Sequence, residues 1–275
     1  MSSVTVPKLS SERTSELADS LTKIRTRIAK AADGRTPTLV AVSKYKPASD
    51  ILACYDLGQR DFGENYVQEL VDKARQLPDD IRWHFIGTLQ SNKAKVLASI
   101  PNIHTIQTLS SVKAADGLNK HIPSTRTVPL NVLLQVNTSG EDAKSGREPL
   151  RLSDSPSSIA SSELVAVAQH IVTACPRLHL HGLMTIGALV ESLSGDENRD
   201  FEVLKETREV LERVLSEDKE ATNWGEEVEG KKRLVLSMGM SSDFESALRA
   251  GADIVRVGTG IFGSRQLKGD TTPST

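Results

Sequence analysis

The stretch LVLSMGMSSDFESALRAGADIVRVGTGIFG, residues 234–263, indicates the fold class. It contains two short apolar segments, 234–236 and 254–257, and a turn of small residues follows each of them. Residues 241–250, between the two segments, have the pattern of a helix. A strand, a helix and a second strand in this order predict two parallel strands joined by a right-handed crossover.

The same alternation extends back through the chain. Six earlier segments rich in Val, Ile and Leu are expected as strands: 39–43, 61–63, 83–86, 103–106, 130–136 and 178–184. Helices are expected over 48–57, 65–76, 91–99, 110–121, 157–174 and 198–217, and an amphipathic N-terminal helix over 10–32. Eight strands with intervening helices predict an α/β protein with a closed (β/α)8 barrel of the TIM type. An open doubly wound sheet is the alternative, but no GxGxxG follows the first strand.

The domain boundaries follow from the same pattern. We expect one domain over 1–275, with a core of about 10–265. The polar segments 141–158 and 216–233 are expected to be mobile surface insertions, and the tail after Phe262 to be frayed. The chain ends soon after the eighth strand, so no C-terminal β-domain is expected.

Composition excludes several classes of function. The formal net charge is −2, from 34 basic and 36 acidic residues, so no broad basic surface for nucleic acid is expected. The two cysteines, Cys54 and Cys175, form no CxxC motif, and no metal site is expected. No apolar run is long enough to span a membrane, and no hydrophobic signal core is present. A cytoplasmic location is expected, with a mitochondrial one as the alternative.

Lys44 is the first candidate for chemistry. It follows the first strand, and active sites of such barrels lie where strands end and the next loops begin. Apolar strand residues below it would desolvate the amine, lower its pKa and make it a nucleophile toward aldehydes. A solvated lysine at a strand end is the alternative interpretation.

The turns after the last two strands are the second candidate. Small residues there allow backbone N–H groups to approach an anion, and a phosphate site after strands seven and eight recurs in these barrels. A simple helix cap at Ser241 or Ser242 is the alternative. Arg256 lies inside the last strand and needs a buried partner, which could be a structural salt bridge. A reactive lysine beside a phosphate site suggests either a Schiff-base aldolase or bound pyridoxal 5′-phosphate.

Six collinear motifs distinguish these two possibilities. The chain closely resembles the pyridoxal phosphate homeostasis proteins, which are related to the N-terminal barrel of alanine racemase. The resemblance rests on AVSKYKP (41–47), FGENYVQE (62–69), WHFIGTLQSNK (83–93), GLMTIG (182–187), LSMGMSSDFESAL (236–248) and VRVGTGIFG (255–263). It implies that Lys44 forms the Schiff base with the cofactor and that Arg256 faces the pyridine nitrogen. It places Ser237, Gly258 and Thr259 around the phosphate, Met240 and Ser241 in the adjoining loop, and Asn65, His84 and Asn137 near the ring.

The resemblance also implies a function. It indicates a monomeric carrier or buffer of pyridoxal phosphate in intracellular vitamin B6 homeostasis, with pyridoxal-phosphate-dependent apo-enzymes as possible recipients. No enzymatic activity is expected, because two-base racemisation needs a group on each face of the substrate and no strong partner for Lys44 is evident. A racemase-type enzyme is the alternative function. For His84, a silent hydrogen-bonded core histidine is the alternative to a role beside the cofactor.

Overall fold

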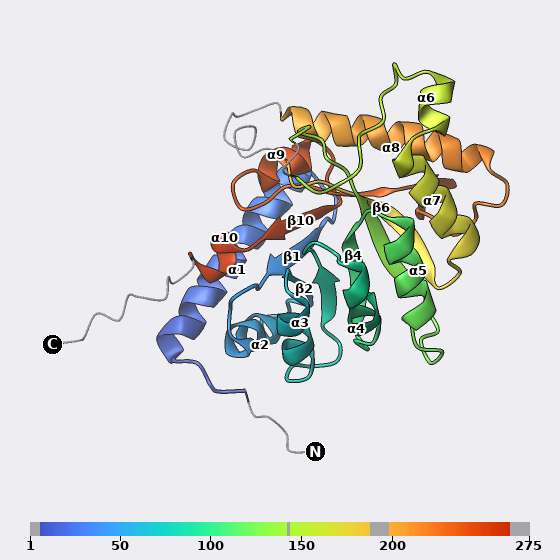
Figure 1. The fold of residues 1–275 in the computed structure, drawn as a ribbon. Coiled ribbons are helices and arrows are strands. Elements are labelled where there is room, and N and C mark those ends of the chain that lie inside the picture. Colours follow the sequence, from blue (N-terminus) through green and yellow to red (C-terminus); the bar gives the residue numbers. More distant parts are fainter. Residues whose placement is uncertain (1–5, 142–143, 188–197, 265–275) are drawn as a thin grey trace.

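Eight parallel strands close into a barrel in the order β1-β10-β9-β6-β5-β4-β3-β2 (Figure 1). The computed structural model describes residues 6–141, 144–187 and 198–264. The barrel strands are β1 Thr38–Val42, β2 Asp61–Glu64, β3 Arg82–Phe85, β4 Ile103–Leu109, β5 Leu130–Gln135, β6 Leu178–Met184, β9 Val235–Ser237 and β10 Ile254–Val257. The closed barrel and the position of every expected strand are therefore confirmed, with ends that shift by a few residues.

Helices surround this barrel. They are α1 Ser11–Ala32, α2 Ala48–Asp56, α3 Val67–Ala74, α4 Ala94–Ala98, α5 Val112–His121, α6 Pro156–Ala160, α7 Glu163–Ala174, α8 Arg199–Glu217, α9 Phe244–Arg249 and α10 Thr259–Phe262, with a short 3-10 turn η1 at Ser91–Lys93. The expected helix 157–174 is in fact two helices. Ser155 caps α6 and Ser162 caps α7 by accepting hydrogen bonds from backbone N–H groups, so the chain starts a new helix at 163.

The side chains of each strand alternate between two environments. Leu39 and Ala41 of β1 belong to the large cluster between strands and helices. Val40, between them, belongs to a small cluster inside the barrel, together with Leu133, Met184, Val235 and Ile254. This period of two places every second residue of a strand inside the barrel, where a ligand at the mouth could be reached.

The N-terminal helix joins the two ends of the described chain. α1 packs against α2, α9 and α10, which Figure 1 shows side by side. Its buried residues are Leu17, Leu21, Ile24, Ile28 and Ala32, as the helical spacing predicts. Arg13 donates to Asp50 at 2.7 Å and to the carbonyl of Phe262 at 2.9 Å, so α1 also fixes the end of α10.

The expected insertions are more ordered than a pair of surface loops. Within 216–233 the chain forms an antiparallel hairpin of β7 Glu226–Val228 and β8 Lys231–Arg233. Trp224, just before it, is buried, and Gly225 donates to the carbonyl of Leu180 at the edge of β6. In the described part of 141–158, Leu150 is buried and bonds Thr207 of α8. Trp224 and Leu150 are buried apolar residues within polar segments, so the average composition of these segments did not predict their packing.

No helix among the described residues is both long and apolar enough to cross a lipid bilayer.

Histidines gather near the start of β3, β4 and β6. His84 and His104 lie with ring centroids 5.2 Å apart, and His179 and His181 lie 5.8 Å apart. His181 contacts Glu226 of the hairpin at 2.7 Å. Burial, reinforced by the neighbouring His84, lowers the pKa of His104 to about 4, and burial also lowers the pKa of His179. The folded protein therefore binds protons at these two rings less tightly than the unfolded chain does.

This lowered pKa predicts acid sensitivity. Stability from an unprotonated His104 is fully present above the ordinary histidine pKa of about 6.5, and it is lost as the pH falls from there toward 4. We expect His104→Asn to reduce the acid-induced loss of unfolding free energy by about 3 kcal/mol over that range. Denaturant titrations at several pH values measure this. His121→Asn, on α5 outside the barrel, is the matched control, and equal pH profiles for wild type and His104→Asn would contradict the prediction.

Candidate functional site

Lys44 lies in the turn that follows β1. Val40, Val42 and Lys44 alternate along the same side of the chain, and Val40 is in register with Arg256 of β10. Lys44 is exposed, which corrects the expectation that apolar strand residues desolvate it. The reason is that β1 ends at Val42, so Lys44 already stands beyond the packed layer of the barrel. Among the described residues no carboxylate pairs with it.

A buried ion pair fixes the turn on both sides of Lys44. Lys73 of α3 donates to Glu64 at 2.6 Å, to Glu69 at 2.7 Å and to the carbonyl of Ser43 at 2.7 Å. Glu64 also accepts from the Ser43 hydroxyl at 2.6 Å, and Glu69 accepts from the N–H of Tyr45 at 2.6 Å. Tyr45 has a φ of 63°, a left-handed conformation that a non-glycine residue adopts only when its surroundings hold it.

Sequence reasoning did not single out Glu64, Glu69 or Lys73. The signal lies in FGENYVQE and the residues that follow it: Glu64 ends β2, and Glu69 and Lys73 lie four residues apart on α3. Burial raises the pKa of Glu64 to about 7, against the lowering effect of the Lys73 ammonium. Its partners are the Lys73 ammonium and the hydroxyl of Ser43, the residue directly before Lys44, so the buried Glu64 carboxyl group helps to hold this turn.

The loop after β9 is a tight turn that requires a glycine at position 239. Gly239 has a φ of +89°, and a Cβ there would lie 2.5 Å from the Cβ of Ala247 in α9. Asp243 accepts from the N–H of Met240 at 2.6 Å and so closes the turn before α9. Only glycine satisfies both the positive φ and the close approach.

The loop after β10 meets this turn. The N–H groups of Gly258 and Gly260 both point to the hydroxyl oxygen of Ser241, at 3.3 and 3.5 Å. These distances are long for N–H donors, so the donors are only weakly engaged. A Cβ on Gly258 would lie 3.2 Å from the carbonyl oxygen of Val42, which places this turn directly beside the strand that leads to Lys44. Thr259 is exposed at the start of α10.

Arg256 is a buried cation held by neutral groups. It is 4% exposed, and its guanidinium donates to the Ser237 hydroxyl at 2.7 Å and to the carbonyl of Thr185 at 2.7 Å. Burial lowers its pKa to about 10, with a small opposing effect of Asp243. The structural salt bridge considered for Arg256 is absent from the described residues. Guanidinium carries five N–H donors, and these contacts use two of them.

His84 of β3 is buried. It is 1% exposed, and its Nε2 lies 3.0 Å from Asp61 while its Nδ1 lies 3.0 Å from the amide nitrogen of Gln107. Burial would raise the pKa of Asp61, but the hydrogen bonds from Arg82 and His84 outweigh it and the pKa is lowered. His84 therefore has the surroundings of the hydrogen-bonded core histidine, and it is linked to Ser237 through Gln107.

Asn65 and Asn137 follow β2 and β5. The side-chain oxygen of Asn65 is buried and has no hydrogen-bond partner in the described part of the chain.

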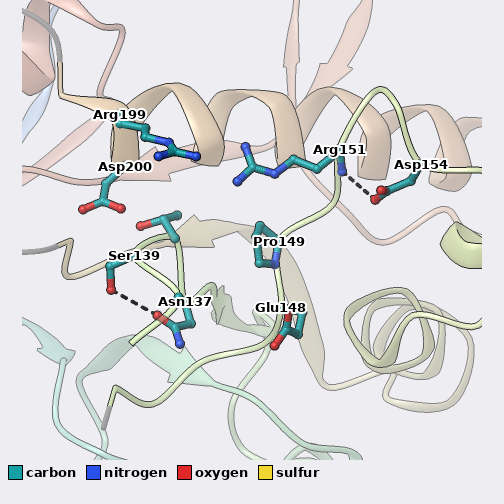
Figure 2. A pocket seen from close by; sticks show the side chains of 10 residues that line it. Asn137, Ser139, Glu148, Pro149, Arg151, Asp154, Arg199 and Asp200 are labelled. Atoms are coloured by element: carbon teal, nitrogen blue, oxygen red, sulfur yellow. Dashed lines mark hydrogen bonds between the residues drawn. The ribbon is translucent and has the colours of Figure 1, made fainter. Parts of the chain in front are cut away.

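Asn137 donates to the carbonyl of Glu141 and lines a pocket of about 530 Å³. The pocket lies between the loop after β5 and the start of α8, and Figure 2 shows Arg151 and Arg199 reaching toward each other across it. Its other lining residues are Thr138, Ser139, Gly140, Glu148, Pro149, Asp154 and Asp200. Of the expected cofactor residues only Asn137 belongs to this pocket.

Comparison with known proteins gives a consistent result. Residues 18–266 match the family model described as alanine racemase, N-terminal domain. A pyridoxal phosphate homeostasis protein of Schizosaccharomyces pombe is 43% identical over 242 residues, which cover 88% of this chain and 90% of that protein. The human pyridoxal phosphate homeostasis protein is 41% identical, over 86% of this chain and 80% of its own length.

Solved structures agree with the sequence relatives. PipY of Synechococcus elongatus, solved with pyridoxal phosphate bound, superposes with a TM-score of 0.63 at 29% identity and covers 90% of this chain and 100% of its own. Alanine racemase from Corynebacterium glutamicum superposes with a TM-score of 0.60 at 16% identity, over 93% of this chain and 63% of its own, and so shares the fold. With full-length relatives at this level of identity, the chain belongs to the family of pyridoxal phosphate homeostasis proteins, built on the barrel of the alanine racemase N-terminal domain.

Proposed function

We propose that this protein binds pyridoxal 5′-phosphate at the barrel mouth and serves as a carrier or buffer of the cofactor. Lys44 would bond to the aldehyde carbon, and Arg256 would donate to the pyridine nitrogen. The N–H groups of Gly258 and Gly260, with Ser241 and Thr259, would hold the phosphate. The cofactor, when bound, supplies an aldehyde that reacts reversibly with amines.

One observation carries this proposal: Arg256 is buried without a carboxylate partner in the described chain. A buried charge is costly unless it is paired or hydrogen-bonded, and three of its five donors remain for a ligand. In the register of β1 and β10, Arg256 is the partner of Val40, four residues before Lys44, which supports a shared site. A ligand with a ring acceptor, an aldehyde and a phosphate would match the donors of Arg256, the amine of Lys44 and the N–H groups of the turn after β10.

The carrier function is supported by the relatives, whose names refer to homeostasis. A permanently charged donor opposite the pyridine nitrogen disfavours its protonation, and an unprotonated ring stabilises carbanions less well. A racemase-type enzyme is the second candidate, favoured by the shared barrel. Apo-enzymes that need the cofactor are the recipients we propose, with the protein acting as a monomer.

The role of Lys44 is tested by removing its amine. We expect Lys44→Ala to abolish the yellow colour of the lysine–cofactor adduct, because the substitution removes the amine that would bond to the aldehyde. Borohydride reduction should then no longer fix the cofactor to the peptide that contains residue 44. Weaker non-covalent binding should remain through the phosphate and ring contacts. Lys46→Ala is the matched control, since the Lys46 amine bonds the carbonyls of Phe262 and Ser264 instead. A specific reducible label on another lysine of Lys44→Ala would overturn the assignment.

The proposed phosphate site in the loop after β10 is tested at Gly258. Gly258→Ala brings a methyl group against Val42, so the turn must shift by a few tenths of an ångström and its N–H donors move with it. We expect the affinity for pyridoxal phosphate to fall by about tenfold. Gly117→Ala on α5 is the control, because a Cβ there meets Ala94 at 3.0 Å, far from the barrel mouth in the helical layer. Unchanged affinity in folded Gly258→Ala would exclude this turn as the phosphate site.

One experiment separates the two candidate functions. Loaded protein incubated with a panel of L-amino acids, followed by chiral chromatography, should give turnover well below about 1 per second, the lower end of ordinary enzyme rates. The same preparation should reactivate a pyridoxal-phosphate-dependent apo-enzyme. Saturable racemisation at ordinary rates that disappears in Lys44→Ala would establish the enzyme and refute the carrier.

A further inference from the structure

A line of buried hydrogen bonds crosses the inside of the barrel from Arg256 to Asp61. Arg256 donates to the Ser237 hydroxyl at 2.7 Å, and that hydroxyl lies 2.7 Å from the side-chain oxygen of Gln107. The amide nitrogen of Gln107 lies 3.0 Å from His84 Nδ1, and His84 Nε2 lies 3.0 Å from Asp61. Five strands contribute one residue each, and every residue of the line is at most 6% exposed.

The two ends of the line fix its direction. An arginine can only donate, so the Ser237 oxygen accepts from it and the hydroxyl proton is directed to Gln107. An ionised aspartate can only accept, so His84 carries its proton on Nε2 and accepts from Gln107 on Nδ1. Every donor in the line therefore points away from the cation and toward the carboxylate, which is the arrangement in which successive hydrogen bonds strengthen one another.

We propose that His84, Gln107 and Ser237 are positioning residues that aim the Arg256 guanidinium at the ring nitrogen of the cofactor. This inference rests on the proposed function. One edge of the guanidinium is bound to Ser237 and to Thr185, so the planar group has a single orientation and its free donors have a single direction. Ser237 thereby supports the arginine with its hydroxyl, while the phosphate is served by the turn at Gly258, Gly260 and Ser241.

The role differs from general core stability in one measurable respect. A positioning role affects only ligands with an acceptor at the ring nitrogen, whereas a loosened barrel would weaken every ligand of the site. The probe pair is pyridoxal phosphate and its analogue with carbon in place of the ring nitrogen. Both keep the aldehyde and the phosphate, but only pyridoxal phosphate offers an acceptor at the ring nitrogen. The change in their affinity ratio between variants therefore isolates the contact with Arg256, since the intrinsic difference between the ligands is the same for every variant.

The test compares dissociation constants of the two ligands across variants. Wild type should bind pyridoxal phosphate about tenfold or more tightly than the analogue, as expected for a hydrogen bond from a charged donor. In Gln107→Leu this ratio should fall to within about threefold, through weaker pyridoxal phosphate binding alone. Ser237→Ala makes the same test with a smaller change of volume, should Gln107→Leu fail to fold. Gln135→Leu is the matched control, because this buried glutamine of β5 donates to the carbonyl of Ser145 and lies outside the line.

Each outcome has a distinct meaning. A wild type that binds neither ligand defeats the proposed function itself. A wild type that binds both ligands equally, or folded Gln107→Leu and Ser237→Ala proteins that keep the wild-type ratio, overturns the positioning role and leaves the cofactor site standing. Nitrogen-15 NMR of the cofactor-free protein tests the direction independently: His84 should be protonated on Nε2 and unprotonated on Nδ1, and the reverse assignment would overturn the line.

Discussion

A single buried cation constrains the inside of this barrel. Arg256 stands on β10 among apolar neighbours, and no described carboxylate neutralises it. The cost of this burial is offset by neutral acceptors, and those acceptors must themselves be held. Ser237, Gln107, His84 and Asp61 follow from that requirement, so a polar line exists where barrels of this kind usually pack branched aliphatic side chains.

A second buried cation, Lys73, holds the turn that follows β1. Lys73 bonds the two glutamates and the Ser43 carbonyl, and through them it fixes both residues beside Lys44. These contacts restrain the backbone beside Lys44 while its amine stays exposed, as the proposed exchange of an aldehyde with incoming amines requires. In the loop after β10, the N–H groups of Gly258 and Gly260 are only weakly engaged by Ser241.

The local part of this organisation could be predicted from the sequence. Apolar segments separated by helical patterns predicted eight strands, and the barrel closes from them in the expected order. The helix break at 161–162 and the hairpin at 226–233 were missed, because a serine cap inside a helical pattern and a buried Trp224 inside a charged segment are weak local signals. Of the expected site residues, His84 is buried beside Asp61, and Asn137 lines the pocket between the loop after β5 and the start of α8.

The strands, the lysine after the first of them and the small-residue turns after the last two could be predicted from the sequence alone, because these features depend on neighbours within a few residues. Which polar side chains support them depends on the folded barrel. Ser237 and Gln107 are 130 residues apart in the chain, and Lys73 reaches Ser43 across 30 residues. Such contacts arise when the barrel closes and the strands take their register. They join residues that are far apart in the chain, so local sequence patterns cannot pair them.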